Sequence, residues 1–380
     1  MNPLEPTPEH GELRDAVRAV LARHPGHAAW APLTARVGAA ALAFPEEYGG
    51  LGCGSAEVAV VMAELGRALS PVPYLGSAVL TAGALLAAGD REACAEHLPG
   101  LADGTVVGAL AWAEAGGWEA SDVTARAEPE GRDWALSGTK RYVLAGPAEP
   151  SLLLAFARTG PAAAPGGDPA TAPRVGPGQG LGLFELTAPP AAFTVRSTMD
   201  RTRPLAELTL DRTPARLLSP DGAAVLARVR DLACTALAAE QAGAAARALE
   251  LTVRYAKERV QFGRPIGSFQ AVKHRLADMY TAVESAHSLA LAAAAADAAP
   301  DLAAAAKSGC SEAFAYVAGE MIQLHGGIGI TWEHEAHEFF KRAHGSARLF
   351  GSPAAHRERL AHRLGFHARP GDSERVTANG

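Results

Sequence analysis

A periodic pattern in the last third of the chain places the strongest constraint on its fold. Residues recur there at alternating steps of four and three positions: Leu237, Gln241, Ala244, Ala248, Leu251 and Tyr255. Positions spaced in this way line one face of an α-helix, so the pattern predicts a long helix. A second helix is predicted by Phe314, Val317, Met321 and Leu324, and the glycines of HGGIG end it. The last third of the chain is therefore expected to be helical.

Strand-like segments separate this region from a helical N-terminus. The early part of the chain carries alanine and leucine at helical spacing, as in AEVAVVMAELGRAL, whereas the middle part has short segments such as TVVGALAWA and LAELTLDRT. We predict an α+β chain with a helical domain, a mostly antiparallel β domain and a second helical domain. The expected bounds are 1–103, 104–219 and 220–366, followed by a disordered tail at 367–380.

Composition excludes several classes of protein. The 380 residues include 35 Lys and Arg against 41 Asp and Glu, without a basic cluster, so neither nucleic acid nor a membrane is an expected partner. The four cysteines are widely spaced without a CxxC pair, which indicates neither a disulfide framework nor structural zinc. With no signal-like start and no run of about 20 apolar residues, the chain is expected to be cytoplasmic.

Two short motifs resemble a zinc site and a dinucleotide site but lack the spacing or the context that these sites require. In HEAHEFF, His334 and His337 are three positions apart, whereas zinc-protease chemistry requires a spacing of four, so no metal site is predicted. The GGIG at 326–329 follows a predicted helix instead of a strand, which disfavours a dinucleotide fingerprint and with it an NADPH-dependent reductase.

The segment YAKERVQFGRPIGSFQAVKHRLADM, residues 255–279, is the most informative one. Its pattern predicts a helix that ends near Gln261, a Phe-Gly turn, a proline and a new helix from about Ser268. From the pattern alone, a helical hairpin with solvated Arg259 and Gln270 explains these residues as well as a binding site does.

Four segments of the chain resemble the acyl-CoA dehydrogenases, a family of flavoenzymes. They are FPEEYGGLG, LSGTKRYVLAG, RVQFGRPIGSFQ and QLHGGIGI, and they occur in the family's order. The resemblance implies a C-terminal four-helix bundle that mediates oligomerisation. It also implies an acyl-CoA substrate and an FAD that lies across a subunit interface.

The resemblance assigns one half of a cofactor site to residues that this chain keeps. In the family, the neighbouring subunit grips the adenine and diphosphate end of FAD. The residues that match are Arg259, Phe262, Gln270, Gln323, Gly326 and Gly327. A guanidinium suits a diphosphate, and glycines allow the backbone to approach closely.

The half that surrounds the flavin ring departs from the family pattern. Ala113 stands where the family has a hydrogen-bonding Thr, although Glu114 follows as expected. The family's Trp-x-Thr is here Tyr142-Val143-Leu144. Tyr142 can stack on the ring, but Ala113 and Leu144 cannot form hydrogen bonds through their side chains.

The expected catalytic base is also missing. Most family members carry a Glu in a Glu-Gly-Thr-like joint between the last two helices, and this chain has Phe350-Gly351-Ser352. Some members place the base near the position of Ala233. The nearest carboxylates are Asp231 and Glu240, which we list as candidates, and Ser121 is a candidate contact for the pantetheine arm of the substrate.

Three functions follow as alternatives. The chain is a catalytically incomplete subunit that completes the FAD site of a related partner, or a self-sufficient homo-oligomeric dehydrogenase with a relocated base. A third alternative is a flavin-fold enzyme of a specialised biosynthetic pathway. In each case the class is an oxidoreductase of acyl-CoA dehydrogenase type, and neither the acyl group nor the electron acceptor follows from the residues.

Overall fold

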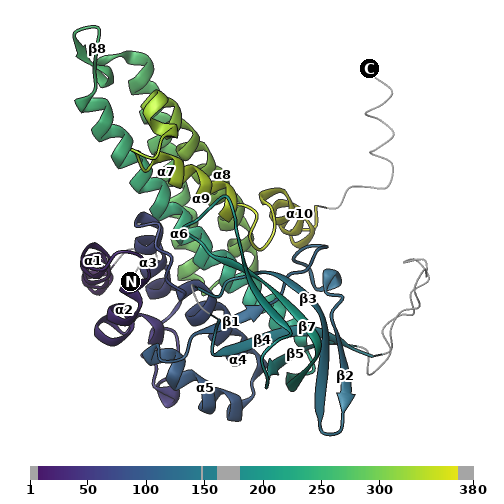
Figure 1. The fold of residues 1–380 in the computed structure, drawn as a ribbon. Coiled ribbons are helices and arrows are strands. Elements are labelled where there is room, and N and C mark those ends of the chain that lie inside the picture. The colour runs from purple at the N-terminus through teal and green to yellow at the C-terminus, as the bar shows by residue number, and fades with distance from the viewer. Residues whose placement is uncertain (1–6, 147–148, 161–179, 367–380) are drawn as a thin grey trace, which may run out of the picture.

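The computed structural model describes residues 7–146, 149–160 and 180–366, and it has the predicted order of helices, strands and helices (Figure 1). The first region contains α1 (Pro8–Arg23), α2 (Trp30–Val37), α3 (Ser55–Arg67), α4 (Ala82–Ala88) and α5 (Arg91–Asp103). A buried π-helix, Leu75–Thr81, leads into α4. Such helices are rare and frequently lie at functional sites, and the alanine and leucine pattern does not distinguish one from an α-helix.

The middle region is a seven-stranded sheet that closes on itself. Its strands are β1 (Gly108–Ala111), β2 (Arg126–Glu130), β3 (Asp133–Val143), β4 (Leu152–Thr159), β5 (Leu181–Leu186), β6 (Ala192–Arg196) and β7 (Leu205–Ser219). Strands β4, β2, β3, β7 and β5 pair in sequence, and β5 pairs with β4 again. Most pairings are antiparallel as predicted, while β4 runs parallel to both β1 and β2.

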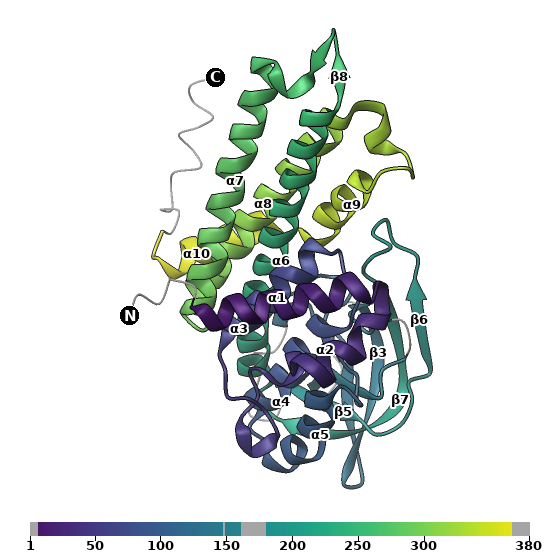
Figure 2. The same ribbon diagram turned by 90° about the vertical axis from the view of Figure 1, so that its left-hand side faces the viewer.

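The last region is a long bundle that projects away from the sheet (Figure 2). It contains α6 (Gly222–Glu258), α7 (Gln270–Ala295), α8 (Pro300–His325) and α9 (Ala336–Ser346), followed by α10 (Pro353–Arg363). Side chains of α6 to α9 share one core, so the predicted four-helix bundle is present. The predicted tail at 367–380 lies outside the described residues. No helix in the described part of the chain is both long and apolar enough to cross a membrane.

The hairpin at the end of α6 corrects the predicted helix bounds. Helix α6 ends at Glu258 and not near Gln261, because β8 (Val260–Gln261) pairs with β9 (Arg264–Pro265). Phe262 and Gly263 form its turn with φ of 53° and 74°. The next helix starts at Gln270, after a 3₁₀ turn at Ile266–Ser268.

Glycines allow α3 and α6 to cross in direct backbone contact. A Cβ at Gly66 would lie 2.0 Å from the carbonyl oxygen of Glu240, and one at Gly243 would lie 2.1 Å from that of Ala63. Neither contact leaves room for a larger residue. The crossing therefore fixes the N-terminal helices to the middle of α6.

We predict that Gly243→Ala destabilises the chain by about 3 kcal/mol, since the new methyl group overlaps backbone atoms that cannot move independently. Gly319→Ala in α8 is the matched control, because a Cβ there meets no atom within 4 Å. It should stabilise the helix by about 0.5–1 kcal/mol. Denaturant unfolding of both variants measures the difference, and equal effects would contradict the close crossing.

Candidate active site

Four aromatic rings fill the space beside the joint between α9 and α10. We call Trp112, Trp118, Tyr142 and Phe350 the aromatic stack. The rings of Trp112 and Phe350 are stacked with centroids 5.6 Å apart, and Trp118 meets Phe350 edge-on at 5.2 Å. Trp118 also stacks on Tyr142 at 5.8 Å. Phe350 is only 2% exposed, so the position of the expected base is occupied by a packed ring.

Trp112 and Trp118 were not predicted as site residues. Trp112 follows strand β1, and its indole Nε1 donates a hydrogen bond to the backbone oxygen of Trp118 at 3.0 Å. Trp118 lies in the segment between Glu114 and Ser121. Ser121 itself is exposed in the short helical turn Ala120–Asp122 that follows.

Two buried polar side chains hold the turn that carries Phe350. His356 Nε2 lies 3.0 Å from the backbone oxygen of Phe350. The Lys307 ammonium donates to the carbonyl oxygens of Ala347 and Gly351, both at 3.2 Å. Phe350 has a φ of 60°, an uncommon conformation for a residue with a side chain. The turn is therefore fixed from α8 and from α10, which the local sequence does not reveal.

The neighbouring carboxylate Glu114 is tied into the sheet. Its oxygens accept hydrogen bonds from the Lys140 ammonium at 2.6 Å and from the backbone N–H groups of Thr124 and Ala125 at 2.8 and 3.0 Å. Burial raises the pKa of Glu114, but the Lys140 charge and these bonds outweigh it, so the pKa lies below its usual value. Glu114 is thus a poor proton acceptor. Ala113 and Leu144 beside it are buried and apolar.

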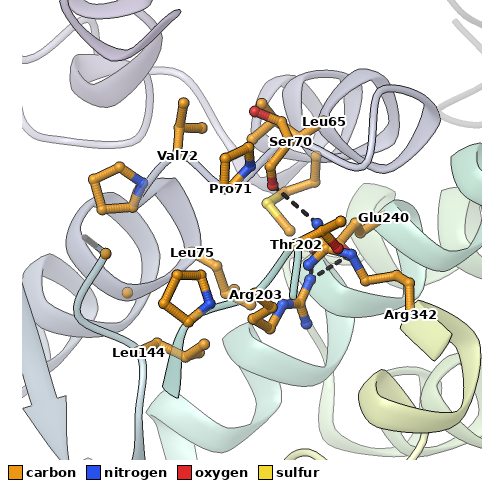
Figure 3. A pocket seen from close by; sticks show the side chains of 15 residues that line it. Leu65, Ser70, Pro71, Val72, Leu75, Leu144, Thr202, Arg203, Glu240 and Arg342 are labelled. Atoms are coloured by element: carbon orange, nitrogen blue, oxygen red, sulfur yellow. Dashed lines mark hydrogen bonds and ion pairs between the residues drawn. The ribbon is translucent and has the colours of Figure 1, made fainter. Parts of the chain in front are cut away.

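The candidate base Glu240 is held in a buried ion-pair network. It pairs with Arg203 and lies 3.7 Å from Arg342 Nε, and Arg342 also donates to the Ser70 carbonyl at 2.9 Å. These groups line a small cleft that Leu144 borders on another side (Figure 3). Two guanidinium groups thus hold the carboxylate of Glu240 in an ion-pair network.

The other candidate, Asp231, lies on α6 near α10. It is 6% exposed, and one of its oxygens lies 3.4 Å from Arg359. Burial raises the pKa of Asp231 even though the charges of Arg359 and Arg230 oppose the shift. A raised pKa brings a carboxyl group closer to the range in which it can act as a general base.

The residues assigned to the other half of the cofactor site gather at the far end of the bundle. Arg259, Phe262, Gln270, Gln323, Gly326 and Gly327 are all exposed. The Tyr255 hydroxyl donates to the backbone oxygen of His325 at 3.3 Å, which ties the end of α6 to the end of α8. Phe262 is 93% exposed. The hairpin that carries it lies opposite the sheet, remote from the aromatic stack (Figure 1).

One group of potential metal ligands occurs in the described part of the chain, at the contact of α5 with the sheet. It comprises Glu96, His97 and Glu185. The Arg216 guanidinium donates to both carboxylates, at 2.9 Å to Glu96 and 2.5 Å to Glu185. Because the Arg216 guanidinium already supplies a positive charge, we interpret this group as an ion-pair cluster that joins α5 to the sheet.

The His356 contact generates a pH-dependent prediction. Burial, together with the charges of Arg359 and Lys307, lowers the pKa of His356 from its ordinary 6.5 to about 3. Below pH 6.5 the unfolded chain therefore binds a proton that the folded chain does not bind, and the free energy of unfolding falls as the pH falls. His356→Gln removes this pH dependence, which lowers the free energy of unfolding by about 1.4 kcal/mol for each pH unit below 6.5. Denaturant unfolding of both chains across this range should show their stability difference shrinking; a constant difference would contradict a neutral buried imidazole.

Comparison with known proteins identifies the family of the chain. The family model described as acyl-CoA dehydrogenase, N-terminal domain, matches residues 7–105, and the C-terminal domain model matches residues 221–365. The chain is 40% identical over 365 residues to acyl-CoA dehydrogenase IpdE2 of Mycobacterium tuberculosis, covering 92% of this chain and 95% of that protein.

Solved structures of two-chain dehydrogenases are also similar. The Tcur3481–Tcur3483 steroid ACAD superimposes with a TM-score of 0.80 at 32% identity, over 94% of this chain and 98% of that one. The ChsE4–ChsE5 complex of Mycobacterium tuberculosis gives a TM-score of 0.81 at 27% identity, over 96% and 99%. This chain belongs to the acyl-CoA dehydrogenase family of FAD-dependent oxidoreductases.

Proposed function

We propose that this chain is the catalytically incomplete subunit of a heteromeric acyl-CoA dehydrogenase and that it completes the FAD site of a related partner chain. The observation that carries the proposal is the contrast between its two half-sites. The reaction pocket is filled by the aromatic stack, whereas the cofactor grip at Arg259 and Phe262 is exposed.

The filled pocket lacks the groups that the reaction requires. Dehydrogenation of an acyl-CoA removes a proton α to the thioester while the β carbon loses a hydride, which bound FAD accepts. The Phe350 ring cannot take up a proton, and a general base is worth about 10² to 10⁴ in rate. The side chains of Ala113 and Leu144 offer no hydrogen bonds to a flavin ring. These residues fit the ring end of FAD poorly.

The exposed grip fits the opposite end of FAD. The Arg259 guanidinium can form paired hydrogen bonds with a diphosphate. A Cβ at Gly326 or Gly327 would meet no atom within 4 Å, so their backbone is open to close approach. This chain's own residues would thus orient the adenine and diphosphate end without contributing to the chemistry at the ring.

Exposed apolar side chains surround the grip and favour a protein partner. Val260, Phe262, Ile330 and Trp332 are 53%, 93%, 71% and 68% exposed. Large apolar groups gathered in this way mark interaction surfaces on otherwise polar proteins. The similar Tcur3481–Tcur3483 and ChsE4–ChsE5 structures each contain two differently named chains, which supports a related chain as the partner.

One observation favours the self-sufficient alternative. The raised pKa of Asp231 suits a general base, and the residue lies on α6 one turn before Cys234, whose sulfur is 3.8 Å from His356 Nε2. A relocated base in this place would serve a homo-oligomer. The same carboxylate is held by Arg359, however, and its neighbour Phe350 is packed between two indole rings.

The partner requirement is tested by FAD content. We expect the chain expressed alone to be colourless or insoluble, and co-expression with an adjacent dehydrogenase-like chain to give a complex with one FAD for each pair of chains. Arg259→Met in that complex should weaken FAD binding by roughly 10- to 100-fold, the loss of a charged hydrogen bond. Arg254→Met, one turn earlier on the exposed surface of α6, is the matched control.

FAD absorbance per chain and its retention on dilution measure both effects. A chain that is yellow on its own, keeps stoichiometric FAD and reduces it with an acyl-CoA would contradict the proposal and support the self-sufficient enzyme.

We further predict that Phe350→Glu does not create an efficient dehydrogenase. The carboxylate would be buried between Trp112 and Trp118, and Ala113 and Leu144 would still leave two contacts to the flavin unmade. Anaerobic titration with acyl-CoA, followed by flavin absorbance, should show no reduction by the variant beyond that of the parent complex. Robust acyl-CoA-dependent reduction would mean that the pocket is otherwise complete.

A further inference from the structure

Polar side chains of α6 and α10 converge beside the turn that carries Phe350. We call Arg230, Asp231, His356 and Arg359 the α6–α10 polar cluster. Asp231 and Arg359 are 3.4 Å apart, and the charges of Arg230, Arg359 and Lys307 all act on His356. His356 in turn contacts the Phe350 carbonyl. The cluster therefore adjoins the aromatic stack but does not contribute to it.

The hydrogen-bonding capacity of this cluster is largely unused. Among the described residues, no hydrogen-bond partner satisfies Arg359 Nε, Arg359 NH1, Arg230 Nε or His356 Nδ1, and these atoms are shielded from solvent. Arg359 NH2 and Asp231 Oδ1 form no hydrogen bond and face each other as an ion pair at 3.4 Å. His356 is 3% exposed and Asp231 is 6% exposed. Leaving buried charged donors unpaired costs several kcal/mol in a folded protein. So many unpaired atoms in one place indicate that the cluster is built around a polar ligand.

The cluster has more hydrogen-bond donors than acceptors and more positive than negative charge. Three of its guanidinium nitrogens, Arg359 Nε and NH1 and Arg230 Nε, have no partner among the described residues. Arg230 is paired through NH1 with Glu119 at 2.6 Å, and Arg359 faces Asp231. The Lys307 ammonium, which bonds to Ser311 and to two backbone carbonyls, adds a charge that no carboxylate in hydrogen-bond range balances. A ligand that complements these groups supplies several acceptor oxygens and negative charge.

We propose that the α6–α10 polar cluster binds a phosphoryl group, with Arg359 as its principal ligand. The planar fork of a guanidinium matches two phosphoryl oxygens, and Arg230 Nε supplies a further hydrogen bond. The phosphoryl group comes either from inorganic phosphate or from the diphosphate of a coenzyme A ester. The site consists of residues of this chain alone, so its test does not depend on the partner subunit proposed above.

Thermal unfolding of the full-length chain tests the site without any flavin readout. Inorganic phosphate and coenzyme A are titrated separately, each against sodium chloride at the same pH and ionic strength, because general screening acts equally in both series. A ligand that binds only the folded chain raises the melting temperature along a saturation curve. We expect such a curve for at least one of the two ligands.

Arg359→Met separates binding from folding. It should weaken the binding of the active ligand at least tenfold. Its melting temperature without ligand is the reference for its own titration, because the substitution also removes the ion pair with Asp231. Arg357→Met on the same helix is the matched control, since Arg357 is exposed and pairs with Glu312. It should bind like the parent chain.

The two titrations also identify the source of the phosphoryl group. Saturation at a lower concentration of coenzyme A than of phosphate assigns the diphosphate of a coenzyme A ester, and the reverse order assigns free phosphate. Equal shifts with both ligands and with chloride, or an unchanged shift in Arg359→Met, would overturn the proposal.

Discussion

The length of α6 is the constraint on which the arrangement of the molecule depends. Cys234 on this helix contacts His356 beside the aromatic stack, and Arg259 caps its far end 25 residues later. A helix rises 1.5 Å per residue, so the two positions are roughly 37 Å apart along its axis. The glycine crossing with α3 fixes the middle of α6 to the N-terminal helices. Within one chain the aromatic stack and the proposed cofactor grip are therefore held far apart, which is why the proposed function requires a second chain.

The sequence predicted the parts of the fold that depend on local periodicity. Apolar residues at helical spacing identified the region of α6 and α8 because each helix buries one face against the bundle. The parallel pairings of β4 with β1 and β2 were missed, since they join segments that are distant in the sequence. The π-helix Leu75–Thr81 was missed because its composition is that of an ordinary helix. The end of α6 was placed too late because the hairpin of β8 and β9 competes with the last helical turn.

The residues of the site divide in the same way: some belong to motifs that the sequence shows, and others are brought together only by the fold. Matching to a family pattern identified Ala113, Leu144 and Phe350 as departures, because each occupies one position in a motif. What replaces the lost groups was not predictable in that way. Trp112 and Trp118 fill the space from β1 and the segment after it, and Lys307 and His356 hold the turn from two other helices. Only the fold brings these four side chains to Phe350.

Residues in both halves of the proposed site have a strained backbone conformation. Tyr142, Phe262 and Phe350 have φ of 57°, 53° and 60°, and they are three of the seven non-glycine residues with positive φ in the described part of the chain. Each such residue costs of order 1 kcal/mol or more and persists only where its surroundings determine it. For Phe350 those surroundings are a buried ammonium, a buried imidazole and two indole rings. These contacts determine the strained conformation, so the packed ring is an integral part of the fold and not a side chain left in an empty pocket. In the subunit proposed above, a rigid centre of this kind would hold the exposed grip at a set distance from the partner chain.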